Sequence, residues 1–150
     1  ITLLSSMSTG SAGIKVSLQD KPVFISSHMM GASVIRHPNG MSSLDGIITG
    51  FAGSQFPLPT RFKTLTNFIA TGRYESHQST VILTNDTGKE ALARYDFAMS
   101  FPRPGTLFTQ IIDWQINFPQ EGFYAFNIFV DGTLVGYYPF YVWRTGVEIK

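Results

Sequence analysis

The feature that most constrains this chain is a pair of strongly β-forming runs that flank Asp131-Gly132 near the C-terminus. An Asp-Gly dipeptide supplies the positive φ angles that a two-residue hairpin turn requires. The two runs together extend from Phe118 to Trp143 and are apolar at most positions. We therefore expect a β-hairpin that is hydrophobic on both of its faces.

The two faces of this predicted hairpin need different covers. Side chains alternate between the faces of a strand, so every second residue shares a face. The first face contains Tyr124, Phe126, Ile128, Val130, Leu134, Tyr138, Phe140 and Val142. The second face contains Phe123, Phe129, Val135, Tyr137, Tyr141 and Trp143. One face suits the core of a sandwich, whereas the second face requires something else to cover it.

Three hypotheses explain what covers the second face. The N-terminal segment folds back over it, the face docks onto a protein partner, or its rings bind carbohydrate. Exposed apolar patches mark contact sites, and aromatic residues are enriched in the centres of protein interfaces. In the carbohydrate hypothesis, Tyr137, Tyr141 and Trp143 stack on sugar rings. The six residues of the second face are therefore the predicted partner-binding residues.

Short β-forming segments separated by turn residues occupy the rest of the chain. Further strands are predicted at residues 14–18, 23–30, 44–51, 61–70, 79–84, 91–99 and 111–118. The second of these ends at Gly31, and the third is interrupted by Gly46 and Gly50. No window sustains helical periodicity. The spacing of the turns predicts an all-β, antiparallel sandwich of about eight or nine strands.

The length of 150 residues indicates one domain. We expect a flexible N-terminal arm at 1–13, a β-sandwich domain at 14–143 and a C-terminal tail at 144–150. The arm is rich in Gly and Ser, and it is either a disordered terminus or a segment that orders against a neighbouring subunit. The chain begins at Ile1 and has no complete signal peptide, so either a leader was removed or the true start lies upstream.

The charge and hydropathy of the chain exclude several classes of partner. Charged residues make up 14% of the sequence, well below the roughly 25% of an average soluble domain. The net charge is +1 and the basic residues are scattered, so we expect no nucleic-acid partner. No apolar stretch approaches the ~20 residues that span a bilayer, so we expect no membrane insertion. A low charge suits a secreted protein or a part of a large assembly.

The sequence carries little that indicates catalysis. It has no cysteine, which removes disulfides, thiolate metal sites and cysteine nucleophiles. His28, His37 and His77 lie in separate segments and form no closely spaced ligand pair. Asp86 and Asp131 lie in turns, where a carboxylate bonds the backbone two residues on. We expect no enzyme activity, no catalytic residue, no cofactor and no metal site.

Several motifs occur in an order that resembles a known family. They are His37-Pro38-Asn39-Gly40, Leu44-Asp45-Gly46, Phe56-Pro57, Asp86-Thr87-Gly88-Lys89-Glu90 and the run from Phe118 to Gly132. This order is similar to that of a family of small bacterial and phage-encoded proteins known as a domain of unknown function, over about residues 20 to 143. The resemblance implies an immunoglobulin-like or jelly-roll-like sandwich and carries over no catalytic residue.

Together these observations favour a non-enzymatic structural or interaction protein. We expect a subunit or an accessory, decoration-type component of a larger assembly such as a phage virion. Its partner is then a protein, through self-association or within the assembly. The alternative is a carbohydrate-binding β-sandwich module. The sequence leaves the compartment open, although a virion or another extracellular assembly is favoured over the cytoplasm.

Overall fold

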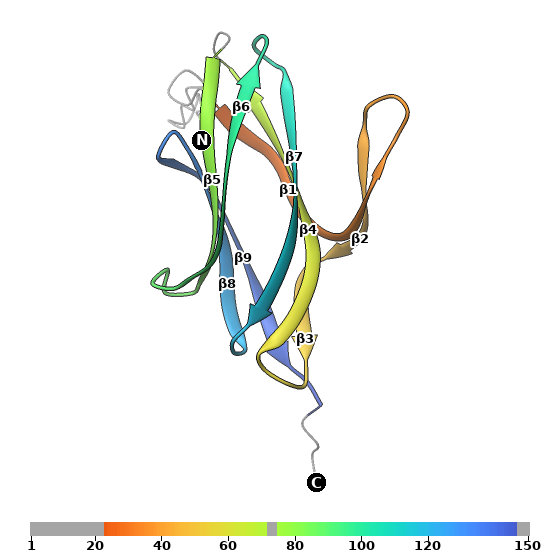
Figure 1. The fold of residues 1–150 in the computed structure, drawn as a ribbon, viewed down its shortest axis with the longest axis vertical. Coiled ribbons are helices and arrows are strands. Elements are labelled where there is room, and N and C mark those ends of the chain that lie inside the picture. The colour runs from red at the N-terminus through yellow and green to blue at the C-terminus, as the bar shows by residue number, and fades with distance from the viewer. Residues whose placement is uncertain (1–22, 72–74, 147–150) are drawn as a thin grey trace, which may run out of the picture.

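Two packed β-sheets make up the part of the chain that a computed structural model describes, residues 23–71 and 75–146 (Figure 1). In spatial order, the four-stranded sheet contains β2 (Ser42–Ile48), β1 (Val23–Arg36), β4 (Leu58–Ala70) and β7 (Leu107–Phe118). The five-stranded sheet contains β3 (Gly50–Gly53), β9 (Thr133–Arg144), β8 (Gly122–Val130), β5 (Glu75–Asn85) and β6 (Ala91–Phe101). The prediction of an all-β sandwich of eight or nine strands is confirmed.

Some of the predicted boundaries fall outside the described ranges. The proposed arm at 1–13 and the proposed strand at 14–18 lie there, as do the last four residues of the proposed tail. Strand β9 ends at Arg144, one residue beyond the predicted end of the domain. Within the described residues, no helix is long and apolar enough to cross a membrane.

The predicted hairpin forms as β8 and β9 around the Asp131-Gly132 turn. Both turn residues have positive φ angles, 50° at Asp131 and 81° at Gly132, as a two-residue turn of this type requires. The strands pair antiparallel from Gly122 opposite Val142 to Val130 opposite Thr133. One face of this ribbon packs against the four-stranded sheet.

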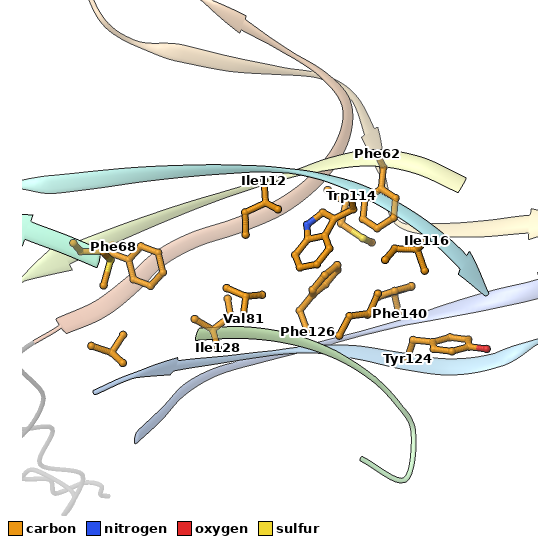
Figure 2. Packing of buried hydrophobic residues seen from close by; sticks show 14 of the residues in the cluster. Phe62, Phe68, Val81, Ile112, Trp114, Ile116, Tyr124, Phe126, Ile128 and Phe140 are labelled. Carbon is orange, nitrogen blue, oxygen red and sulfur yellow. The ribbon is translucent and has the colours of Figure 1, made fainter. Parts of the chain in front are cut away.

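The inward face of the hairpin supplies the centre of the core. Figure 2 shows Phe126 between the two sheets, with its ring centroid 5.2 Å from that of Trp114 and 5.6 Å from that of Phe140. The buried indole of Trp114 donates a hydrogen bond of 2.8 Å to Thr64 Oγ1. The alternation of side chains along β8 therefore places its inward residues as predicted.

The buried side chain of Tyr124 has a hydrogen-bond partner for its hydroxyl. Its ring is buried, and its hydroxyl donates a 2.5 Å hydrogen bond to the carbonyl of Gln120, just before β8. Burial raises the pKa of this hydroxyl above its ordinary value. A tyrosine that bonds the backbone a few residues upstream is the tyrosine corner of immunoglobulin-type sandwiches.

The predicted faces of β9 were wrong at two residues because of one register shift. Gly136 pairs with Ile128, but Leu134 pairs with Phe129, so Val135 is an extra residue on the β9 side. A bulge of this kind reverses the alternation beyond it. Leu134 is therefore exposed, contrary to the prediction, and Val135 packs against the core instead of pointing outward.

Two further strand predictions were wrong at glycines. Strand β1 does not end at Gly31 but continues to Arg36 as one half of a hairpin with β2. The predicted strand at 44–51 divides, because β2 belongs to the four-stranded sheet and β3 to the five-stranded sheet. β3 pairs parallel to β9, so one pair of this otherwise antiparallel sandwich is parallel.

Candidate functional site

The outward side of β8 and β9 carries a group of mostly aromatic side chains. We call this group the aromatic face; it contains Phe123, Phe129, Leu134, Tyr137, Tyr141 and Trp143. Phe123 is 57% exposed, Tyr137 is 54% exposed and Trp143 is 50% exposed. The hypothesis that an N-terminal cover lies over this face concerns residues 1–22, which lie outside the described ranges.

Five of the six predicted partner-binding residues come together here. Phe123, Phe129, Tyr137, Tyr141 and Trp143 all lie on the outward side of the hairpin. Val135 does not, because the bulge turns it toward the core. Leu134 takes its place on the outward side. The face was predictable from alternation, whereas the exchange of Leu134 for Val135 depended on a register shift that has no clear sequence signal.

Three rings of the aromatic face form a row across the hairpin. The ring centroids of Phe123 and Tyr141 lie 4.8 Å apart at an interplanar angle of 82°. The centroids of Tyr141 and Trp143 lie 5.2 Å apart at 54°. Edge-to-face and tilted pairs at these distances are favourable for aromatic rings. The row is therefore a preformed surface rather than a set of independent side chains.

Gly50 of β3 leaves the space that the Trp143 indole occupies. A Cβ atom on Gly50 would lie 2.6 Å from Cζ3 of Trp143 and 2.7 Å from the carbonyl oxygen of Tyr141. Only glycine lets β3 approach β9 this closely while the indole lies against it. The interruption predicted at Gly50 is thus a site of close approach between a strand and a ring.

The end of β9 next to Trp143 is held by polar contacts. Glu121 Oε2 accepts a 3.0 Å hydrogen bond from the backbone N–H of Arg144. The Arg144 guanidinium lies 4.6 Å from the ring centroid of Phe56 and donates a hydrogen bond to the carbonyl of Ser54. These contacts fix the strand that presents the ring row.

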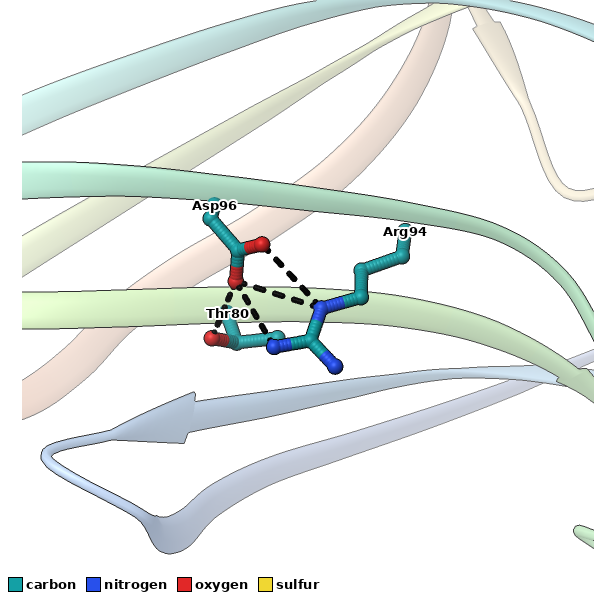
Figure 3. A network of polar contacts seen from close by, with 3 residues as sticks. All are labelled: Thr80, Arg94 and Asp96. Atoms are coloured by element: carbon teal, nitrogen blue, oxygen red, sulfur yellow. Dashed lines mark hydrogen bonds and ion pairs between the residues drawn. The ribbon is translucent and has the colours of Figure 1, made fainter.

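The other half of the same outer surface, on β5 and β6, is polar. Asp96 accepts hydrogen bonds from the Arg94 guanidinium and from the Thr80 hydroxyl, as Figure 3 shows. The Arg94 hydrogen bond is the main reason that the pKa of Asp96 lies below its ordinary value. The outward side of the five-stranded sheet is therefore divided into an aromatic half and a polar half.

A second candidate lies between the sheets, where the sequence indicated nothing. A cavity of about 320 Å³ is lined by His28, Ile48, Phe126, Tyr138 and neighbouring residues of β1, β2, β8 and β9. The His28 ring stacks on Tyr138 at 4.3 Å, and its Nδ1 lies 2.8 Å from Thr66 Oγ1. Burial lowers the pKa of His28 to about 4, so this imidazole is neutral at pH 7.

Gln110 extends the polar character of this part of the interior. It lies opposite Thr66, which lies opposite His28, so three polar side chains form one row across β7, β4 and β1. Gln110 is only 6% exposed, and neither atom of its amide has a hydrogen-bond partner. Ile112, Trp114, Ile116 and Phe118 recur at every second position, and one further step of this period reaches Gln110, which is the sequence signal that would have indicated its inward orientation.

The His77–Asp131 pair holds the Asp131-Gly132 turn against β5. His77 Nδ1 lies 2.6 Å from Asp131 Oδ2, and the backbone N–H of Gln78 donates to Asp131 Oδ1 at 2.9 Å. Asp131 thus ties its turn to β5, rather than bonding the backbone two residues on. The His77 hydrogen bond lowers the pKa of Asp131 below its ordinary value. The His77 side chain is buried, whereas the Asp131 side chain is half exposed at the turn.

The titratable residues do not gather into a metal site in the part of the chain that the structure covers. No three His, Asp or Glu side chains within residues 23–71 and 75–146 lie close enough to hold an ion. Asp113 is instead bonded by Arg61 and Lys63, each at 3.2 Å on the outer side of the four-stranded sheet. The hydrogen bond from Arg61 is the main cause that lowers the pKa of Asp113.

Comparison with known proteins identifies a family but no activity. The family model described as "Family of unknown function (DUF6941)" matches residues 31–143. No curated protein matches the chain. Among solved structures, the Pseudomonas fluorescens alkylpurine DNA glycosylase AlkC bound to DNA containing an abasic site analog has a similar fold, with a TM-score of 0.54 and 16% identity. That likeness covers 83% of this chain and 31% of the glycosylase, so it concerns the fold alone.

Two other solved structures are more distant. A β-glucuronidase from glycoside hydrolase family 2 has a TM-score of 0.44 at 10% identity, over 77% of this chain and 11% of the enzyme. The C-terminal domain of wzt has a TM-score of 0.49 at 10% identity, over 83% of this chain and 75% of that domain. Both likenesses are too weak to bear on function.

Proposed function

We propose that this chain, which belongs to the family of unknown function DUF6941, is a non-enzymatic interaction protein whose aromatic face docks onto a protein partner within a larger assembly. The observation that supports the proposal is the ring row of Phe123, Tyr141 and Trp143, in which Phe123 and Trp143 are at least half exposed, on a sheet whose other side packs against the four-stranded sheet. Exposed apolar patches mark interaction sites, and aromatic residues are enriched in interface cores.

The size of the ring row sets how much it contributes to binding. An aromatic side chain carries about 150–250 Å² of surface, so the two rings that are about half exposed, Phe123 and Trp143, and the less exposed Tyr141 together offer roughly 250 Å². At about 25 cal/mol per Å², their burial contributes roughly 6 kcal/mol before the costs of association. Those costs are about 4–15 kcal/mol, so the rings supply the centre of an interface and rim contacts must supply the rest.

The inclination of the rings favours a protein partner over carbohydrate. A sugar ring stacks on the flat side of an aromatic ring, so a flat oligosaccharide is bound best where several such sides share one plane. Here Tyr141 is inclined at 82° to Phe123 and at 54° to Trp143. Inclined rings leave notches that protein side chains fill. Binding of carbohydrate remains the alternative that the experiment below distinguishes.

The assembly itself stays a prediction. Low charge and an aromatic surface suit a component that packs repeatedly against its neighbours, and a decoration-type component of a phage virion is one form of this proposal. A decoration-type component of a virion implies an extracellular location.

A paired substitution tests the proposed role of the face. The protein is purified from its native source with Tyr141→Ser and Trp143→Ser together, and the size of its complex is measured by light scattering. The matched control is Leu107→Ser, which removes an exposed apolar side chain from the other sheet. We expect the double variant to lose the complex and the control to keep it.

The same proteins distinguish the alternatives. A complex that survives the double substitution contradicts the proposal. Quenching of Trp143 fluorescence by soluble oligosaccharides, with a complex that depends on added sugar, favours the carbohydrate module instead. Circular dichroism must show that the double variant remains folded.

A further inference from the structure

Strand β6 forms one edge of the five-stranded sheet, and no strand in the described part of the chain pairs with its outer side. It has 11 residues, whereas β3 at the opposite edge has four. In Figure 1, β6 and β7 lie close together near the turn that joins them and diverge away from it. An edge strand presents a row of unpaired backbone N–H and C=O groups. The N-terminal half of β6 is therefore accessible to one more strand.

Strand β6 has few of the features that keep edge strands apart. Natural edges are often protected by lysine, by proline or by a charge that points toward the core. β6 contains neither lysine nor proline, and its two charged residues, Arg94 and Asp96, lie on the outer side of the sheet (Figure 3). A bulge at Leu92 interrupts only the beginning of the strand. The rest of β6 is regular and able to pair.

The charges of β6 make the strand complementary to itself. In an antiparallel pair of identical strands, the residue numbers of every opposed pair have the same sum. When Arg94 of one copy lies opposite Asp96 of the other, Asp96 of the first copy therefore lies opposite Arg94 of the second. The Arg94 side chain is 62% exposed and that of Asp96 is 47% exposed, and Arg94 Nη1 donates no hydrogen bond within the described residues. Opposite charges on directly opposed residues stabilise a pair of strands.

The same register suits the uncharged side chains. It places Tyr95 opposite Tyr95 of the other copy, and Phe97 opposite Ala93. These residues alternate with the charged ones, so they lie on the inner side of the sheet. Tyr95 is 48% exposed, so its ring can form an aromatic pair across the two copies. The ring of Phe97 faces only the methyl group of Ala93, so the pairing is not crowded.

The other long edge strand, β7, lacks this complementarity. It lies at the edge of the four-stranded sheet, and its one charged residue is Asp113. Asp113 is already paired with Arg61 and Lys63 of β4. A strand with a single charge cannot place opposite charges together when it pairs with a copy of itself. The order of charges therefore favours pairing of β6 with β6.

We propose that two copies of this chain associate edge to edge through antiparallel pairing of residues 93–97 of β6, centred on Tyr95. A two-fold axis perpendicular to the sheet relates the copies, and it joins their five-stranded sheets into one continuous sheet. The polar halves lie at the centre of its outer side and one aromatic face lies toward each end. The dimer therefore presents two aromatic faces in the same direction. The pairing does not depend on the function proposed for those faces.

The contact is short, so the dimer is expected to be weak. Five residues per copy are well below the about 20–30 residues per side of a standard interface. Weak pairing is sufficient in a larger assembly, because two linked binding faces raise the effective affinity for a repeated partner. The dimer should accordingly form only at high protein concentration when the chain is isolated.

A substitution at the centre of the contact tests this arrangement in the whole chain. Sedimentation velocity at protein concentrations up to about 1 mM measures the dimer dissociation constant. We expect Tyr95→Lys to weaken the dimer by about tenfold or more, because two lysine side chains would lie directly opposite each other. Tyr137→Lys, at a similarly exposed tyrosine of the aromatic face, is the matched control and leaves the dimer unchanged.

A charge exchange tests the register. Arg94→Asp and Asp96→Arg should each weaken the dimer by about three- to tenfold, because each variant opposes like charges at two symmetric positions. The double variant should recover most of the loss. Arg61→Asp is the matched control, since Arg61 also pairs with a carboxylate but lies on the other sheet. This control should leave the dimer unchanged, and urea unfolding of every variant verifies that it is folded.

Three results would overturn the proposal. The first is a chain that remains monomeric at about 1 mM, which would mean that any strand added to β6 comes from a different protein. The second is an equal loss of association in Tyr95→Lys and Tyr137→Lys, which would place self-association on the aromatic face. The third is a double charge variant that associates no better than the single ones. None of these variants of β6 alters the ring row, so this proposal and the proposed function fail separately.

Discussion

The two faces of the β8–β9 hairpin have the same strands and the same kinds of side chain, yet they differ in what covers them. Phe126 on the inward face is fully buried against Trp114 and Phe140, whereas Phe123 on the outward face is more than half exposed. Aromatic composition alone therefore does not indicate a core. The inward rings stabilise the fold, and the outward rings are available for recognition.

The largest expected effect is the difference in stability between a substitution on the inward face and one on the outward face. Phe126→Ala should lower the free energy of unfolding by about 3–5 kcal/mol, because it removes a fully buried ring and leaves a cavity. Phe123→Ala, the matched control on the adjacent outward side, should cost less than about 1 kcal/mol. Urea unfolding of both variants measures the difference. Equal losses would show that the outward ring is structural as well.

The second effect depends on pH and concerns the buried His28. Its pKa is about 4 in the folded protein and about 6.5 when unfolded, so between these values the unfolded state binds more protons. Stability should therefore fall as the pH is lowered from 6.5 to 4, by roughly 3 kcal/mol from this residue, and no further below that range. Asp131, with its lowered pKa, loses its contribution only at still more acidic pH.

Unfolding measured from pH 7 to pH 4 checks this behaviour. His28→Leu should remove the part of the pH dependence that lies between 6.5 and 4, whereas Met29→Leu at the adjacent position should retain it. An unchanged slope in His28→Leu would mean that the folded protein protonates this imidazole normally.

A third, intermediate effect concerns the close contact between Gly50 of β3 and the Trp143 indole of β9. Gly50→Ala should cost about 1–3 kcal/mol, because its methyl group overlaps the Trp143 indole and the Tyr141 carbonyl. The displaced indole should also change the near-ultraviolet circular dichroism. A variant with native stability and an unchanged spectrum would show that β3 moves aside freely.

The smallest effect is expected in the polar half of the outer surface. Arg94→Ala removes the main hydrogen bond to an exposed carboxylate, so the pKa of Asp96 should rise toward its ordinary value without a measurable change in melting temperature. A nuclear magnetic resonance titration of Asp96 measures the pKa. A lower melting temperature would indicate that the Thr80–Arg94–Asp96 network stabilises the sheet edge.

The sequence predicted the hairpin better than the strands before it. Asp131-Gly132 specifies a turn, and alternation then assigns Phe123 and Phe126 to opposite faces without any knowledge of distant segments. The exchange of Val135 for Leu134 on the outward side was missed. Both residues are apolar, so the sequence pattern gives no sign of the extra residue in β9. Local pattern therefore fixes the faces until a bulge intervenes.

Several other missed features depend on contacts that are remote in sequence. Gly50 was predicted only to interrupt a strand, but its role is to leave space for Trp143, which is 93 positions away. The division of residues 44–51 between two sheets follows from the parallel pairing of β3 with β9. His28 and Gln110 likewise gain their significance from a row that three strands bring together. None of these pairings has a local sequence signal.

Acrylamide quenching of tryptophan fluorescence tests most directly whether the outward rings serve association. The chain has two tryptophans, and Trp114 is buried in the core, so it is an internal reference for Trp143. We predict that Trp143 is readily quenched in the isolated protein and is protected when the protein is in its native complex. A Trp143 that is shielded in the isolated protein, or one that remains equally accessible in the complex, would contradict this assignment.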